Sequence, residues 1–247
     1  MKCPFDISKL YCIPCDTSFK YECVGENIVS SVGEVCGNKY VICECVAGAT
    51  FINGSCVCDT SCSVGNIYYS DDTCNSCLDN TKTAVGVVVK DNELITQIDY
   101  SSVAWASIAD TNVSGLEDMK KDIAIADMNG FDNTKKIIEF YTSDNETNNA
   151  GWYCYNLEIE GLENRTNEWY LPAVGELYNY YYKNYNLIIK GFSVLGKSYS
   201  NLNVWSSSEI GFYRAWKFNV ATGELNGNTV YDLKTNKLPI ACFLKIK

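Results

Sequence analysis

The chain has 247 residues, a formal net charge of -10 at pH 7, fourteen cysteines and no histidine. An acidic chain without clustered Lys and Arg is poorly suited to nucleic acid or to an anionic membrane surface. Without histidine, the Ser-His-Asp and Cys-His nucleophile pairs, imidazole acid-base catalysis and histidine zinc sites are excluded.

The cysteines are divided unevenly along the chain. Twelve lie between Cys3 and Cys77, and the other two are Cys154 and Cys242. Small segments that cannot bury enough apolar surface are stabilised by disulfides, which persist in oxidising compartments. No signal peptide follows Met1, and no apolar run reaches the ~20 residues of a transmembrane helix. We therefore expect a secreted or cell-surface protein whose signal peptide has been removed.

Zinc is the alternative explanation for the N-terminal cysteines. Cys12-x-x-Cys15 and Cys74-x-x-Cys77 have the spacing of zinc knuckles. These two pairs are far apart and the chain has ten other cysteines, eight of them in the same segment, so we favour disulfides and expect no bound metal. The pairing within this set cannot be read from the sequence: Cys3, Cys12, Cys15, Cys23, Cys36, Cys43, Cys45, Cys56, Cys58, Cys62, Cys74 and Cys77.

Residues two apart on a strand lie near the upper distance limit for a disulfide. Cys43 and Cys45 are therefore expected to bond elsewhere, as are Cys56 and Cys58. Asn53-Gly54 lies between two β-prone stretches, which predicts a hairpin. We interpret residues 1–82 as a disulfide-rich, mostly β module that acts as a stalk, with a direct binding role as the alternative.

Residues 83–247 have the composition of an ordinary globular domain. The apolar stretch 84–89 predicts a buried strand, with 94–98 as its hairpin partner. Helices are predicted from Ser114 to about 126, and over 134–141, 150–157 and 173–182, the last with Pro172 at its start. Strands are predicted over 203–207, 215–220, 229–233 and 240–246. Helices followed by antiparallel strands indicate an α+β fold.

Several motifs in this part occur in a recognisable order. They are Ala84-Val85-Gly86-Val87-Val88, Asp127-Met128-Asn129-Gly130-x-x-Asn133-Thr134, Trp169-Tyr170-Leu171-Pro172-Ala173-x-Gly175-Glu176-Leu177, Trp205-Ser206-Ser207-Ser208-Glu209 and Ala215-Trp216 before Gly223. Together they resemble the C-terminal domain of bacterial collagen-like adhesins, the Lcl C-terminal type. The resemblance covers residues 83–247 and implies a C-type-lectin-like fold, related to formylglycine-generating enzymes, that binds ligands through a loop face.

The resemblance also implies a disulfide between Cys154 and Cys242, since such domains commonly tie the first main helix to the last strand. Two features depart from the pattern. Pro239-Ile240-Ala241-Cys242 replaces the usual Arg-Pro of the closing strand, and the calcium-binding triplets of animal lectins are absent. Calcium-dependent sugar binding of that type is not expected.

Residues 198–219 are rich in Tyr, Asn and Ser, a composition that suits recognition. Trp205 and Trp216 are assigned to the core because large aromatic side chains are mostly buried. The predicted ligand-binding residues are Tyr199, Asn201, Asn203, Phe212, Tyr213 and Arg214. A second aromatic cluster, expected to be core or its rim with any exposed remainder a contact surface, contains Tyr178, Tyr180, Tyr181, Tyr182 and Tyr185.

Two sets of polar residues invite a functional interpretation. Asp127, Asn129 and Asp132 supply oxygens but lack EF-hand spacing, so we interpret them as turn and cap residues rather than a calcium site. Glu176 and Glu209 could form a carboxylate pair, but a glutamate that opens a helix is explained by the helix dipole. We predict no catalytic residue and no cofactor.

The leading hypothesis is an exported, non-enzymatic adhesin or receptor-binding protein that recognises a glycan or protein on another surface. It would bind no nucleic acid and would not insert into a membrane, and it could form oligomers. The first alternative is a structural subunit of a surface appendage, tail fibre or envelope. The second is a divergent enzyme of the formylglycine-generating type, which would need a cysteine pair to bind copper.

Overall fold

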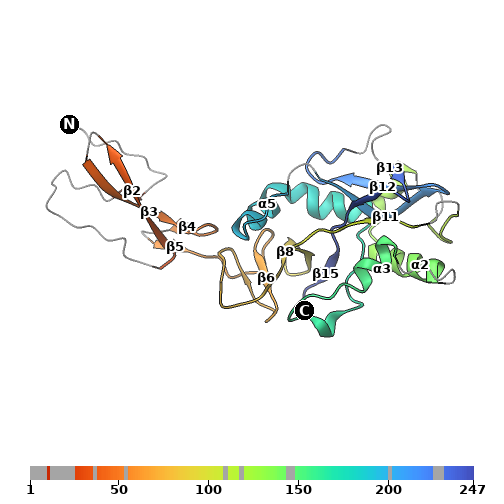
Figure 1. The fold of residues 1–247 in the computed structure, drawn as a ribbon, viewed down its shortest axis with the longest axis horizontal. Helices are drawn as coiled ribbons and strands as arrows, with labels where there is room; N and C mark the ends of the chain where they lie inside the picture. The colour runs from red at the N-terminus through yellow and green to blue at the C-terminus, as the bar shows by residue number, and fades with distance from the viewer. Residues whose placement is uncertain are drawn as a thin grey trace.

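The computed structural model describes residues 10–11, 26–35, 38–52, 55–107, 111–116, 120–142, 148–199, 202–224 and 231–247 (Figure 1). Within these ranges both helices and several antiparallel sheets are present, so the predicted α+β class is confirmed. None of the helices in the described ranges is both long and apolar enough to cross a bilayer.

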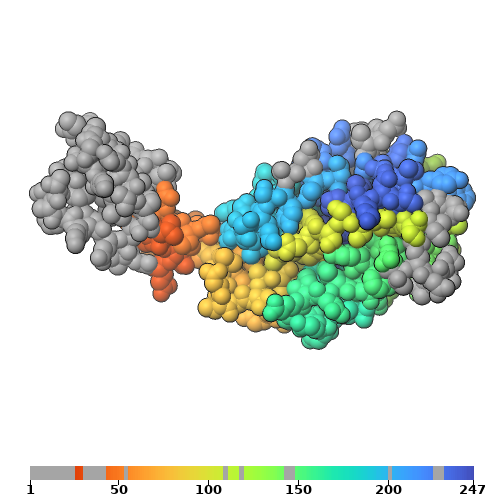
Figure 2. Space-filling view, in the orientation of Figure 1, coloured from red at the N-terminus to blue at the C-terminus, as the bar shows by residue number. Residues whose placement is uncertain are grey.

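The N-terminal part contains two small sheets. β1 (Leu10–Tyr11), β2 (Ile28–Val35) and β3 (Asn38–Cys45) form an antiparallel sheet in the order β1-β3-β2. β4 (Thr50–Ile52) and β5 (Ser55–Val57) form the hairpin that the Asn53-Gly54 signal predicts, although those two turn residues lie outside the described ranges. Figure 2 shows the residues around β4 and β5 as a narrow neck beside the larger body.

Disulfides lie beside the β4–β5 hairpin and at the start of the larger body. In the described residues up to Cys77 the bonds are Cys45–Cys56, Cys58–Cys77 and Cys62–Cys74, and Cys43 is also disulfide-bonded. The sulfurs of Cys74-x-x-Cys77 are therefore engaged with other cysteines, so this motif has no thiolate left for zinc. The neighbours Cys43 and Cys45 are not bonded to each other, nor are Cys56 and Cys58, as expected. Cys3, Cys12, Cys15, Cys23 and Cys36 lie outside the described residues.

The first large sheet has five strands in the order β15-β9-β8-β6-β7. They are β6 (Ile67–Tyr69), β7 (Cys74–Asn75), β8 (Ala84–Lys90), β9 (Leu94–Gln97) and β15 (Phe243–Lys245). The apolar stretch predicted as a buried strand is β8, and β9 is its hairpin partner. The expected division between residues 82 and 83 falls inside this sheet, because β6 and β7 precede it and β6 pairs with β8.

The remaining strands form two further sheets. β10 (Ser102–Ala104) pairs with β14 (Lys237–Pro239). β11 (Asn203–Gly211), β12 (Arg214–Asn219) and β13 (Tyr231–Leu233) form an antiparallel sheet in sequence order. This three-stranded sheet lies across the body from the N-terminal strands (Figure 1).

The helices agree with the predictions only in part. α2 (Gly130–Thr142) and α3 (Ala150–Tyr155) match two predicted helices. The predicted start at Ser114 is wrong: Gly115 has φ +79°, which favours glycine in a turn, and α1 spans Lys121–Ala126.

The helix predicted over 173–182 is not uniform. It consists of α4 (Val174–Glu176), a π-helical segment (Leu177–Tyr181) and a 3-10 turn (Tyr182–Asn184). α5 (Tyr185–Val194), which the sequence did not predict, follows directly and buries Ile188 and Phe192. A short 3-10 helix also spans Glu163–Arg165.

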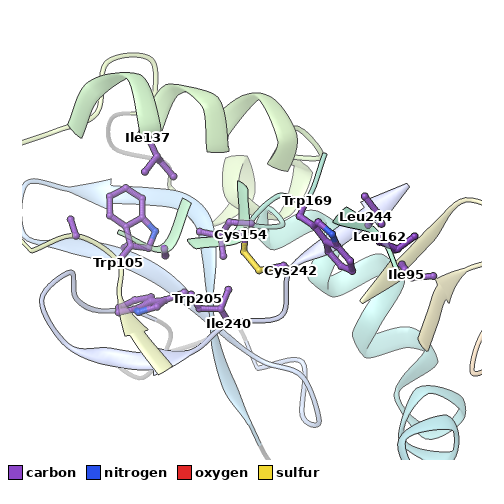
Figure 3. Close-up of a cluster of buried hydrophobic side chains, with 14 of the residues drawn as sticks. Ile95, Trp105, Ile137, Cys154, Leu162, Trp169, Trp205, Ile240, Cys242 and Leu244 are labelled. Atoms are coloured by element: carbon purple, nitrogen blue, oxygen red, sulfur yellow. A yellow bond between two sulfur atoms is a disulfide. The ribbon is translucent and has the colours of Figure 1, made fainter. Parts of the chain in front are cut away.

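Two hydrophobic clusters hold the body together. The first contains the fully buried Trp105, Trp169 and Trp205 around the Cys154–Cys242 disulfide (Figure 3). The second packs α5 and the π-helical segment against β12, and it includes Trp216. The assignment of Trp205 and Trp216 to the core is confirmed, with exposed fractions of 0% and 3%.

Candidate functional site

The turn between β11 and β12 projects two aromatic side chains into solvent. Gly211 pairs with Arg214, which leaves Phe212 and Tyr213 as the two turn residues, and Gly211 has φ +144°, a value that glycine adopts readily. Phe212 is 56% exposed and Tyr213 is 60% exposed, with their ring centroids 6.5 Å apart. Large aromatic residues this exposed are candidates for a contact surface.

β13 extends this surface. The Lys234 N–H donates to the Tyr213 carbonyl at 3.0 Å, so Arg214 and Leu233 form the next, non-hydrogen-bonded pair, whose side chains lie close together. The exposed Arg214 guanidinium lies over the Tyr231 ring at 4.8 Å, and Leu233 is 45% exposed. We call Phe212, Tyr213, Arg214, Tyr231 and Leu233 the turn patch.

An open pocket beside Arg214 is lined by Tyr231, Asp232 and Leu233. Asp232 is already engaged: it accepts from Lys217 Nζ at 2.9 Å and from Asn236 Nδ2 at 2.7 Å. Burial alone would raise the pKa of Asp232, but these hydrogen bonds and that from the Leu233 N–H lower it below its usual value. Asp232 is therefore ionised and paired at neutral pH.

A buried ion pair anchors the turn to the body. Lys234 Nζ donates to Glu209, and both side chains are fully buried. Lys234 also donates to the Thr111 carbonyl at 2.7 Å, while Glu209 accepts from the Val113 N–H at 2.9 Å. Because Lys234 bonds the backbone of Tyr213 as well, the pair fixes the turn patch against the 111–113 segment.

The structure separates the predicted ligand-binding residues into two groups. Phe212, Tyr213 and Arg214 lie together at the turn. Asn203 pairs with Asn219 at the opposite end of β11, about 26 Å away at ~3.3 Å per residue. Asn201 lies outside the described residues.

Tyr199 is a packing residue more than a surface one. Its ring stacks on Tyr100 at 4.7 Å and meets Phe192 edge-on at 4.9 Å, and its hydroxyl donates to the Ile98 carbonyl. Sequence reasoning missed Tyr231 and Leu233 as members of the turn patch. The predicted strand over 229–233 was the available signal, but its pairing with β12 could not be read from the sequence.

The second aromatic cluster is largely covered. Tyr181 is fully buried, and the rest are half-buried: Tyr178, Tyr180, Tyr182 and Tyr185. Lysines cover two of the rings, with Lys183 Nζ 5.3 Å from the Tyr178 centroid and Lys90 Nζ 4.9 Å from that of Tyr180. The prediction of core and rim is confirmed.

Asp127 belongs to a buried polar network. Its carboxylate accepts from the Asn129 N–H at 3.0 Å, from Asn133 Nδ2 at 2.6 Å and from Ser208 Oγ at 3.3 Å. Asn129 and Asp132 are exposed. The described part of the chain contains no group of three His, Cys, Asp or Glu side chains placed to hold a metal ion.

Glu176 is buried beside the same network. It accepts from the Ala173 N–H at 2.8 Å, the Gly130 N–H at 3.1 Å and the Tyr170 hydroxyl at 2.9 Å. Burial raises its pKa from 4.5 to about 7, although these hydrogen bonds oppose the shift. Glu176 and Glu209 bind different partners, since Glu209 pairs with Lys234.

The two cysteines of this part are bonded to each other. Cys154 on α3 and Cys242 before β15 form the disulfide that the resemblance implied, with a Cα–Cα distance of 5.5 Å. In this state their sulfurs cannot act as the thiolate ligands that copper chemistry of the formylglycine-generating type would need.

The chain was compared with protein-family models, curated proteins and solved structures, and none of them gave a match.

Proposed function

We propose that this protein is an exported, non-enzymatic binding protein of the adhesin or receptor-binding type, and that the turn patch is its ligand face. The observation that carries the proposal is the exposure of Phe212 and Tyr213, both more than half exposed, beside the Arg214–Tyr231 stack. Aromatic side chains with few rotatable bonds give contact area at low entropic cost, and Arg is enriched with them at binding hot spots.

The buried contacts beneath the turn support a role in recognition, because they hold the turn backbone in one conformation. Lys234 bonds the turn backbone and is itself buried against Glu209 and Trp105, with Nζ 5.0 Å from the Trp105 ring. A preorganised face loses less conformational entropy when a ligand binds. The turn patch therefore has the support expected of a binding surface.

A C-type-lectin-like arrangement is part of this proposal. Its support is the antiparallel sheet that joins the early hairpin β8–β9 to the last strand β15, the separate sheet β11–β13, and the helices between them in the sequence. The Cys154–Cys242 disulfide, which joins a helix to the segment before the last strand, agrees with that arrangement.

Export is proposed from the four described disulfides and the bonded Cys43, because such bonds persist in oxidising compartments. Non-reduced and reduced peptide maps of protein recovered from the culture medium would test this step. Free thiols at these cysteines, or retention of the chain in the cytosol, would contradict it.

The test of the function is a binding screen with matched variants. Labelled protein is applied to an array of purified glycans and cell-surface proteins and compared with the variant Phe212→Ser/Tyr213→Ser/Arg214→Gln. The control is Ile123→Ser/Lys190→Gln, which removes an equally exposed apolar side chain and an exposed charge elsewhere. We expect binding to be lost only in the turn-patch variant; equal binding by all three proteins would refute the assignment.

A structural or assembly subunit is the second candidate, and the β4–β5 hairpin favours it. Phe51, Ile52 and Val57 on this hairpin are 48%, 49% and 45% exposed. Exposed apolar side chains on a short hairpin suit a subunit contact. Sedimentation over a range of concentrations tests it: polymers that disappear in Phe51→Ser/Ile52→Ser would support assembly, and a monomer at all concentrations would exclude it.

A further inference from the structure

The apolar members of the turn patch favour one class of ligand over another. Phe212 and Leu233 have no hydrogen-bonding side-chain group, yet they are 56% and 45% exposed. A sugar ring offers an apolar face but also hydroxyl groups on its edge, and these groups need polar partners when they lose water. An aliphatic or aromatic protein side chain has no such need.

The Asp232 carboxylate, which lines the pocket beside Arg214, is engaged by other groups of the fold. Asp232 already accepts from Lys217, Asn236 and the Leu233 N–H. A sugar hydroxyl would have to compete there with hydrogen bonds that the fold already makes. The Asp232 carboxylate is therefore a poor acceptor for a neutral sugar.

Arg214, in contrast to Asp232, has its charge unpaired among the described residues. Its guanidinium stacks on Tyr231, and it forms no ion pair with any side chain in the described ranges. The adjacent acid, Asp232, is paired with Lys217. Arg214 thus presents unneutralised donors beside exposed apolar groups, and a carboxylate is the complement that its planar fork binds best in a protein partner.

We infer that the ligand of the turn patch is a protein surface that presents an apolar side chain beside an Asp or Glu carboxylate. The apolar side chain packs on Phe212 and Leu233, and the carboxylate binds Arg214. This inference rests on the function proposed above and chooses between its two ligand classes.

The experiment uses a phage-displayed library of short random peptides as the probe. The library is selected on the intact protein and depleted on the Phe212→Ser/Tyr213→Ser/Arg214→Gln variant, while an array of purified glycans is screened in parallel with the same two proteins. Enriched peptides are synthesised, and their affinities are measured by calorimetry against Phe212→Ser, Arg214→Gln and the control Ile123→Ser/Lys190→Gln.

We expect enriched peptides that combine an apolar residue with Asp or Glu. Their affinity should fall by about tenfold or more in Phe212→Ser and in Arg214→Gln, but not in the control. When the peptide carboxylate is changed to its amide, the affinity for the unmodified protein should fall by the same factor. The affinity for Arg214→Gln should not fall further, because the partner of the carboxylate is already missing.

The remaining outcomes separate the inference from the proposed function. Glycans that bind through the turn patch would overturn the protein-ligand inference and leave the binding function standing. Peptides rich in Lys or Arg, or peptides indifferent to Arg214→Gln, would overturn the inference. If neither peptides nor glycans depend on the turn patch, both proposals fail.

Discussion

Lys234 and Glu209, 25 residues apart in the sequence, form an ion pair in which both side chains are fully buried. The pair joins β11 to the residue after β13, and further hydrogen bonds from its two side chains reach Thr111 and Val113. Three segments that are distant in sequence therefore depend on one buried pair, next to the turn that carries Phe212 and Tyr213.

Removing one partner of this pair should be costly. Lys234→Met keeps most of the side-chain volume but leaves the Glu209 carboxylate buried without its cation, so we expect a loss of about 3–5 kcal/mol in the free energy of unfolding. Urea unfolding followed by tryptophan fluorescence measures it. A loss below about 1 kcal/mol would show that Glu209 finds another partner or becomes neutral.

The double variant Glu209→Gln/Lys234→Met separates the charge from the packing. The glutamine side chain introduced there carries no charge but retains an oxygen that can accept from the Val113 N–H. We expect the double variant to be more stable than Lys234→Met alone, because no uncompensated charge is buried. Equal stability of the two variants would indicate that lost packing, and not the charge, causes the effect.

The Cys154–Cys242 disulfide should stabilise the body strongly. It closes a separation of 88 residues, for which the chain-entropy model gives roughly 4–5 kcal/mol. Cys154→Ser/Cys242→Ser should therefore lower the thermal midpoint of unfolding by roughly 8–20 °C. An unchanged midpoint under non-reducing conditions would contradict this contribution.

Glu176 should make stability depend on pH. Its pKa is raised by burial from 4.5 to about 7, so the folded state binds its proton more tightly than the unfolded state does. The contribution of Glu176 to the free energy of unfolding is fully present below about pH 4.5 and is lost as the pH rises to about 7. The loss amounts to roughly 3 kcal/mol at most.

Glu176→Gln tests this dependence. Glutamine can keep the hydrogen bonds with the Ala173 N–H and the Tyr170 hydroxyl but does not titrate. We expect the fall in unfolding free energy between pH 4.5 and 7 to be smaller in Glu176→Gln, whereas the exposed control Glu160→Gln should behave as the parent protein. A parallel pH profile for Glu176→Gln and the parent would rule out the raised pKa.

Truncation of Trp205 should lower the stability far more than truncation of Tyr213. Trp205 is fully buried and its indole N–H donates to the Val103 carbonyl, so Trp205→Ala should cost about 3–5 kcal/mol. Tyr213 is 60% exposed, so Tyr213→Ala should change the unfolding free energy by less than about 0.5 kcal/mol. Chemical unfolding of both variants checks the pair, and a large loss from Tyr213→Ala would mean that this side chain supports the fold.

The motifs behind the family resemblance map largely onto the interior. Asp127, Asn133 and Ser208 are buried in one hydrogen-bonded network, and Glu176 lies next to it. The order of these residues along the chain could be read from the sequence, but their contact in one network could not. The same sequence reasoning could not separate Tyr199, which packs on Tyr100, from Tyr213, which faces solvent.

Local patterns in the chain were enough to predict the α+β class, the strands β8 and β9, the disulfide-rich N-terminal part and the burial of Trp205 and Trp216. These features follow from hydrophobic periodicity, turn residues and composition, each of which is a property of a short segment. Three other features could be seen only in the tertiary structure. They are the pairing of β6 with β8, the π-helical interruption at Leu177–Tyr181, and the contact of Arg214 with Tyr231 and Leu233. These features depend on contacts between distant segments, whose register is set by packing and hydrogen bonding that no local pattern encodes.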